Sequence, residues 1–141
     1  MTAPQRLLPV ELVQQFGESV ASPDPSLAAP ALLIARLGYP WLDSAPYLAK
    51  LESMGSALSD KFSLSDKPNM PNGPIDALNK YLFQEQGFSG NTENYDDPRN
   101  SFLNQVLDRR TGIPLTLAVV YIEVARRAGI RVDGVNFPGH F

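Results

Sequence analysis

Two side chains of this sequence have the chemistry of a base and of a nucleophile. His140 is the only histidine, and an imidazole can act as a general base or as a ligand near neutral pH. Thr116 offers a hydroxyl near the start of a predicted helix, but a threonine nucleophile needs a base that holds it. In the alternative, His140 closes a tight Pro-Gly turn and Thr116 caps the helix or bonds the backbone. The residues favour a structural or binding role for both.

Oxygen-bearing side chains are dense between residues 91 and 100. They belong to Asn91, Asn94, Tyr95, Asp96, Asp97 and Asn100. Oxygen ligands suit a hard cation, but the spacing does not match an EF-hand loop. Asp97 and Asn100 are also placed to cap helices. We therefore expect no metal here, and we keep Asn100 as a candidate binding residue.

A charged run, Asp108-Arg109-Arg110, follows this cluster. Such a run at a helix end is usually a solvated face. Arg110 is the preferred exception, because a planar guanidinium can bind loop carbonyls or a carboxylate. The glycines of GFSGN and FPGH lack a phosphate-binding spacing, so we expect no nucleotide cofactor.

A helix expected from Pro114 onward positions these residues. Pro114 fits a first turn, where its missing N–H costs nothing, Gly112 breaks the chain before it, and Gly129 suits a left-handed C-cap. Residues 115–125 are almost wholly apolar, so we expect this helix to be buried on nearly every side. A strand is expected to follow, over residues 130–137.

Helical patterns also precede this central helix. We expect helices over residues 8–20, over 27–37, after a cap at Asp43 or Ser44, from Pro74 to Gly87, and from Asp97-Pro98 onward. The apolar residues expected to surround the central helix, together with its own, are Leu117, Val120, Val124, Phe102, Val106, Ile75, Leu78 and Leu82. Proline, asparagine and glycine crowd residues 65–74 and predict a boundary between an N-terminal helical part, 1–72, and a core, 73–141.

Composition narrows the class of protein. A chain of 141 residues with 43% hydrophobic and 19% charged residues suits one soluble globular domain. The net charge of −3 gives no general attraction to nucleic acid or to an anionic membrane. The absence of cysteine excludes disulfides and thiolate chemistry within this sequence and fits a reducing, cytoplasmic compartment. No signal peptide is expected from the N-terminal residues.

Several short motifs occur in one order within residues 88–141. They are GFSGN, Asn94-Tyr95, Asp97-Pro98-Arg99-Asn100-Ser101, Val106-Leu107, Arg110, Gly112-Ile113-Pro114 and Pro138-Gly139-His140-Phe141. This pattern resembles the N-terminal domain of the SirB1-like proteins, which are related to the transglutaminase-like (papain-like) superfamily. From about residue 27 to 86 the resemblance is limited to the helical pattern.

The resemblance implies a fold and a site. The fold class is α+β, predominantly α-helical: a transglutaminase-like core with a central buried helix followed by the start of an antiparallel sheet, truncated at its C-terminal end. In that superfamily a cysteine at the start of the central helix is paired with a histidine on a strand. The cysteine position falls at Pro114 or Leu115 and the histidine position at His140, so the site resembles a triad that has lost its nucleophile.

We therefore expect a catalytically inactive domain that binds a protein partner or acts as a scaffold. The candidate binding residues are Pro114, Thr116, His140, Asn100 and Arg110, with no catalytic residue, metal or cofactor. One alternative is a hydrolase or transferase that acts on peptide or amide bonds through Thr116 or a water activated by His140. Another is a purely structural helical adaptor.

Overall fold

The computed structural model describes residues 10, 14, 18, 26–64 and 73–130 of the chain. Within the N-terminal segment, the described residues Val10, Gln14 and Glu18 are helical and exposed. The remainder of the helix predicted over residues 8–20 lies outside the described residues. So do most of the predicted boundary segment, the strand predicted over residues 130–137 except its first residue, and His140.

Helix α6, Pro114–Arg127, is the central element, as predicted. Pro114 occupies the first turn, and Gly129, with φ of +76°, lies just past the C-terminal end. Local rules therefore set both ends of this helix. The prediction that α6 is enclosed on nearly every side is wrong at its start, because Leu115 is 71% exposed.

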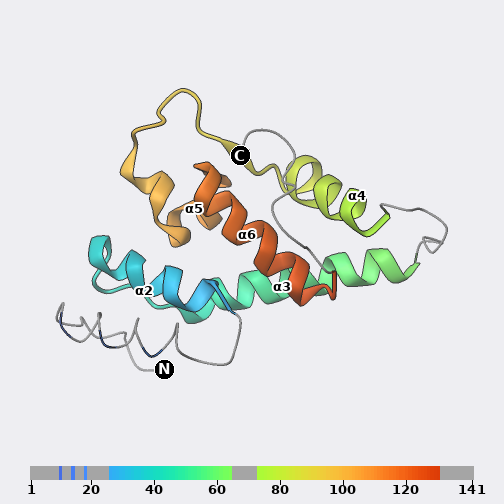
Figure 1. Ribbon diagram of the computed structural model, residues 1–141, viewed down its shortest axis with the longest axis horizontal. Helices are drawn as coiled ribbons and strands as arrows, with labels where there is room; N and C mark the ends of the chain where they lie inside the picture. Colours follow the sequence, from blue (N-terminus) through green and yellow to red (C-terminus); the bar gives the residue numbers. More distant parts are fainter. Residues whose placement is uncertain (1–9, 11–13, 15–17, 19–25, 65–72, 131–141) are drawn as a thin grey trace.

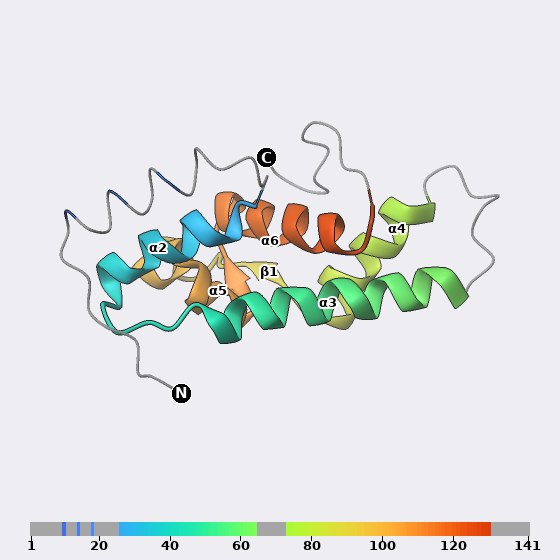
Figure 2. The ribbon, with the colours of Figure 1, turned by 90° about the horizontal axis from the view of Figure 1, so that it is seen from below.

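Two earlier helices pack against α6. They are α2, Ala28–Gly38, and α3, Ala45–Leu64. The predicted cap of α3 is confirmed, since Asp43 Oδ1 accepts a hydrogen bond from the N–H of Ala45 at 3.1 Å. In Figures 1 and 2, α6 lies across α3, with α2 and α4 towards the opposite ends of α3. This arrangement gives α6 most of its cover.

The segment predicted as one helix from Pro74 to Gly87 has two parts. α4 spans Gly73–Asn79, and a π-helix, η1, continues over Lys80–Glu85. Gly87, with φ of +77°, follows η1 and turns the chain. A π-helix widens the backbone turn by one residue, and no pattern in the sequence predicted it.

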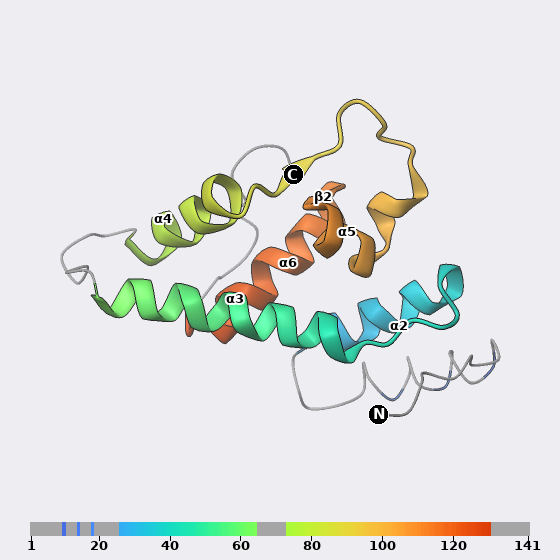
Figure 3. The ribbon, with the colours of Figure 1, turned by 180° about the vertical axis from the view of Figure 1, so that it is seen from behind.

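Residues 88–112 contain the one sheet that the described residues form. Strand β1, Ser89–Gly90, pairs in parallel with β2, Thr111–Gly112 (Figures 2 and 3). This parallel pair was not predicted from the sequence. The predicted antiparallel sheet was to start after residue 130 and falls outside the described residues.

The helix predicted from Asp97 onward is interrupted. A 3-10 turn, η2, spans Pro98–Ser101, and α5 spans Leu103–Arg109, with an extended Phe102 between them. The prediction that Phe102 faces the core is wrong. Its ring packs edge-on against Tyr39, with 5.5 Å between the ring centroids, at the end of α2. The extended backbone at Phe102 explains this, because it turns the side chain away from the helical face.

One apolar cluster joins α2, α3, α4, η1, α5 and α6. Six of the predicted members are buried in it: Leu78, Leu82, Val106, Leu117, Val120 and Val124. Ile75, also predicted, is partly buried and packs against the cluster. The predicted division at residue 72 lies in a segment that the structure does not describe, so it stays a prediction. None of the described helices is both long and apolar enough to cross a membrane.

Candidate functional site

Thr116 lies in the first turn of α6 and is buried. Its hydroxyl donates to the Asn100 carbonyl at 2.7 Å and accepts from the Ile113 N–H at 3.2 Å. The second bond caps the helix, which was one of the two roles predicted for Thr116 as an alternative to a nucleophile. Gly112 makes this contact possible, because a Cβ there would lie 2.7 Å from Thr116 Oγ1.

Asn100 is fully buried and connects α6 to the loop before η2. Its side-chain amide donates to the carbonyls of Asn94, at 2.9 Å, and Tyr95, at 3.1 Å. Its side-chain oxygen accepts from Asn91 Nδ2 at 3.0 Å. Asn100 was expected to cap a helix, but its side chain instead binds this loop. Since its carbonyl also accepts from Thr116, one residue fixes the loop against the start of α6.

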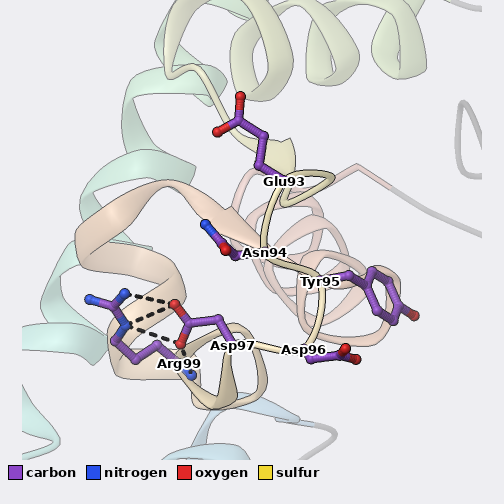
Figure 4. A pocket seen from close by; sticks show the side chains of 6 residues that line it. All are labelled: Glu93, Asn94, Tyr95, Asp96, Asp97 and Arg99. Atoms are coloured by element: carbon purple, nitrogen blue, oxygen red, sulfur yellow. Dashed lines mark hydrogen bonds and ion pairs between the residues drawn. The ribbon is translucent and has the colours of Figure 1, made fainter.

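The loop held by Asn100 lines an open, polar cavity of about 470 Å³. Figure 4 shows its lining residues: Glu93, Asn94, Tyr95, Asp96, Asp97 and Arg99. The guanidinium of Arg99 binds both carboxylate oxygens of Asp97, with 2.7 Å between Nη2 and Oδ2. Asp97 also accepts from the Arg99 N–H and so caps η2, as predicted.

The paired Asp97 is strongly acidic. Hydrogen bonds from the Arg99 side chain, and then from its N–H, lower the pKa of the Asp97 carboxyl to about 2. The Asp97 carboxylate therefore stays charged near neutral pH, and its hydrogen bonds are used to cap η2. Among the described residues, no group of three or more acidic, histidine or cysteine side chains could hold a metal ion.

Arg110 ends α5 and has a left-handed backbone, with φ of +58°. Its Nη1 atom donates to the Gln86 carbonyl at 3.0 Å and to Gln86 Oε1 at 2.6 Å. The guanidinium carbon lies 5.1 Å from the centroid of the Phe88 ring. Arg110 thus binds a loop carbonyl. Loop carbonyls were one of the two kinds of partner predicted for it, the other being a carboxylate.

The candidate residues do not all share one place. Pro114, Thr116 and Asn100 meet at the start of α6, where one hydrogen bond joins the last two. Arg110 lies at the other end of β2, where it binds the chain after η1. His140 lies outside the described residues.

Glu123 is the important side chain that the sequence reasoning missed. It is fully buried in α6. One carboxylate oxygen accepts from the Ala28 N–H at 2.9 Å and from the Ser26 hydroxyl at 3.0 Å. Arg126 and Arg127 lie 3.2 and 3.1 Å from its two oxygens. The available signal was an acidic residue in an apolar run with arginines three and four positions later.

The pKa of Glu123 reflects two opposing effects. Burial alone would raise the pKa of this carboxyl, but hydrogen bonds from Ala28, Arg126, Ser26 and Arg127 outweigh burial and lower it. Glu123 is therefore a charged group that joins α6 to the start of α2. Its contacts with the Ala28 N–H, the Ser26 hydroxyl and the two arginines that follow it in α6 indicate a structural role.

Comparison with known proteins defines the class. The chain belongs to the transglutaminase-like superfamily, whose family model matches residues 45–141. The resemblance read from the motifs is thereby confirmed. No solved structure matches the chain.

The relatives of this chain include two bacterial proteins and one from mouse. A UPF0162 protein of Xylella fastidiosa (strain 9a5c) is 46% identical over 93% of this chain and 47% of its own length. One from strain Temecula1 is 50% identical over 82% of this chain and 40% of its own. F-box only protein 21 of Mus musculus is 43% identical over 48% of this chain and 11% of its own. The chain therefore spans less than half the length of each.

Proposed function

We propose that this chain is a catalytically inactive transglutaminase-like domain that binds another protein at the start of α6. The main support for catalytic inactivity is the Thr116 hydroxyl, because it is buried and hydrogen-bonded to the Asn100 carbonyl at 2.7 Å. A threonine nucleophile needs a hydroxyl that is held by a base and open to substrate. Bonding to a backbone carbonyl supports a structural role for this hydroxyl instead.

The other residues at the start of α6 support the same proposal. The sequence contains no cysteine, and Pro114 and Leu115 occupy the positions where the superfamily resemblance puts one. Proline also removes an N–H that could otherwise stabilise an oxyanion. The chemistry of a thiol enzyme is thus absent from these positions.

Exposed apolar side chains near this point suit a protein partner. Leu115 is 71% exposed and Tyr95 is 62% exposed. Large apolar and aromatic side chains of this kind supply much of the binding energy at protein interfaces. Asn100 holds the carbonyl of Tyr95, so the loop is fixed before binding, which lowers the entropic cost.

The candidate binding residues, the domain division and the location predicted from the sequence are part of this proposal. Pro114, Thr116 and Asn100 would shape the surface at the start of α6, Arg110 would hold the chain at the other end of β2, and His140 would contribute from outside the described residues. The division into an N-terminal part and a core, and a cytoplasmic location without nucleic-acid binding, are predictions from the sequence. Among the relatives, the names UPF0162 protein and F-box only protein 21 mention no reaction.

Binding can be tested with surface variants. We would compare proteins captured by the whole natural protein with those captured by a Tyr95→Ala, Leu115→Ser variant. Ser56→Ala, at an exposed position on α3, is the matched control. Loss of one partner from the double variant alone is the expected result. Identical capture by all three proteins would contradict a binding surface at the start of α6.

Inactivity needs a separate assay. Purified protein is incubated with generic peptide, glutamine-donor and ester substrates, and no turnover above background is expected. Turnover by the unmodified protein that disappears in Thr116→Val or His140→Ala would support the hydrolase alternative. Thr116→Val keeps the shape of the side chain but removes the hydroxyl, so its thermal unfolding is recorded in parallel.

A further inference from the structure

The outward face of α2 is apolar and exposed among the described residues. Ala28, Leu32 and Ala35 are buried on the inner face, and Pro30 is buried as well. The outward side chains are Leu27, Ile34, Leu37 and Trp41, which are 40, 43, 63 and 64% exposed and which we call the α2 stripe. In Figure 1, α5 and α6 lie on one side of α2 only.

The α2 stripe follows one face of α2, on which the intervening Pro30 is buried. Leu27, Ile34 and Leu37 are seven and three residues apart, which is the spacing of one face of a helix. Trp41 lies in the turn just past α2, and this turn is held by a hydrogen bond from the Leu42 N–H to the Tyr39 carbonyl at 2.9 Å. The only charged residue of α2 is Arg36. Such an apolar face is normally covered.

The N-terminal segment has a matching face. Val10, Gln14 and Glu18 are helical and exposed, and they are spaced by four residues, so they define one outward side. In a helix of 3.6 residues per turn that contains these three positions, the opposite side would carry residues 8, 12 and 16. These are Leu8, Leu12 and Phe16. All three are apolar.

The connection between the two faces is short. Seven residues, 19–25, separate Glu18 from Ser26, and they include Pro23 and Pro25. Short connections between helices favour antiparallel neighbours. The segment can therefore reach α2 of its own chain, where its effective concentration far exceeds that of a separate partner.

We propose that the N-terminal segment, residues 8–18, binds the α2 stripe as an antiparallel amphipathic helix through Leu8, Leu12 and Phe16. The consequence is that the α2 stripe is an internal contact of this chain. A protein partner would then bind elsewhere on the molecule.

The sole tryptophan of the chain gives a direct test, because Trp41 belongs to the α2 stripe. Acrylamide quenching of its fluorescence is measured for the unmodified chain and for Leu12→Asp, Phe16→Asp. We expect the quenching constant to rise about twofold in the double variant, since an uncovered indole has more surface in water. Gln14→Asp, on the exposed side of the same segment, is the matched control and leaves the constant unchanged.

Two results would overturn the proposal. The first is an equal quenching constant in the unmodified chain and in a double variant that still unfolds cooperatively. If the double variant does not fold, the single variant Leu12→Asn replaces it, and an equal constant again contradicts the proposal. The second is quenching that depends on protein concentration and not on these substitutions. That result would assign the cover of the α2 stripe to a second copy of the chain.

Discussion

Glu123 in α6 accepts a hydrogen bond from the backbone N–H of Ala28, 95 residues earlier in the chain, at 2.9 Å. This N–H is one of the unpaired donors at the start of α2. A side chain of one helix thus caps another helix. The two arginines that follow Glu123 in α6 compensate its charge, which makes burial of the carboxylate tolerable.

Replacing Glu123 by glutamine should strongly destabilise the fold. The variant keeps the shape of the side chain but leaves Arg126 and Arg127 without their buried counter-charge. We expect the free energy of unfolding to fall by about 3 kcal/mol, as for other buried pairs that lose one partner. Chemical denaturation measures this change.

Glu52→Gln is the matched control for this prediction. Glu52 also pairs with Arg127, at 3.0 Å, but its side chain is 69% exposed. A surface pair is worth less than about 1 kcal/mol, so the control should lose little. Equal losses in the two variants would contradict the structural role of Glu123.

Glu123 should also make stability depend on pH. Its pKa is lower in the folded chain than in the unfolded chain, where a glutamate has a pKa of about 4.3. The unfolded state therefore binds the proton first, and stability falls as the pH drops from about 4.3 through the lower folded pKa. Unfolding experiments between neutral and acidic pH should show this loss. In Glu123→Gln the loss in this range should be smaller.

Gly55 in α3 allows α6 to approach closely. A Cβ at this position would lie 2.4 Å from the Cβ of Arg127. Neither atom belongs to a flexible chain end, so the helices themselves would have to separate. Gly55→Ala should reduce the free energy of unfolding by about 1–3 kcal/mol, the usual cost of overpacking. Gly90→Ala is the control, because no atom lies within 4 Å of the added methyl group; a stable Gly55→Ala would contradict this packing.

The sequence was sufficient where local rules determine the structure. Pro114 and Gly129 fix the ends of α6 through backbone geometry that depends on a few neighbours. The core positions of α6 follow in the same way from helical spacing. Thr116 has the short-range capping bond that its place near a helix start suggested.

The sequence was insufficient where distant residues decide. The partner of Glu123 lies 95 positions away, and no helical pattern contains that information. Phe102 likewise packs against the distant Tyr39, just past the end of α2, and no local pattern contains that contact. Similarly, β1 and β2 are only two residues long, and their parallel pairing is set by the chain that folds between them.

Arg110 combines an unfavourable backbone conformation with favourable side-chain contacts. Two substitutions separate the energetic effect of the backbone from that of the contacts. Its φ of +58° is costly for a residue with a Cβ, whereas its guanidinium binds Gln86 at 2.6 and 3.0 Å. Arg110→Ala loses these bonds and keeps the strained backbone. Arg110→Gly loses the same bonds but removes the strain. We therefore expect Arg110→Gly to be more stable than Arg110→Ala by about 1 kcal/mol in chemical denaturation, with both variants below the unmodified chain. If Arg110→Gly were instead the most stable of the three, the contacts with Gln86 would contribute less than the strain costs, and Arg110 would have to be kept for a purpose other than stability.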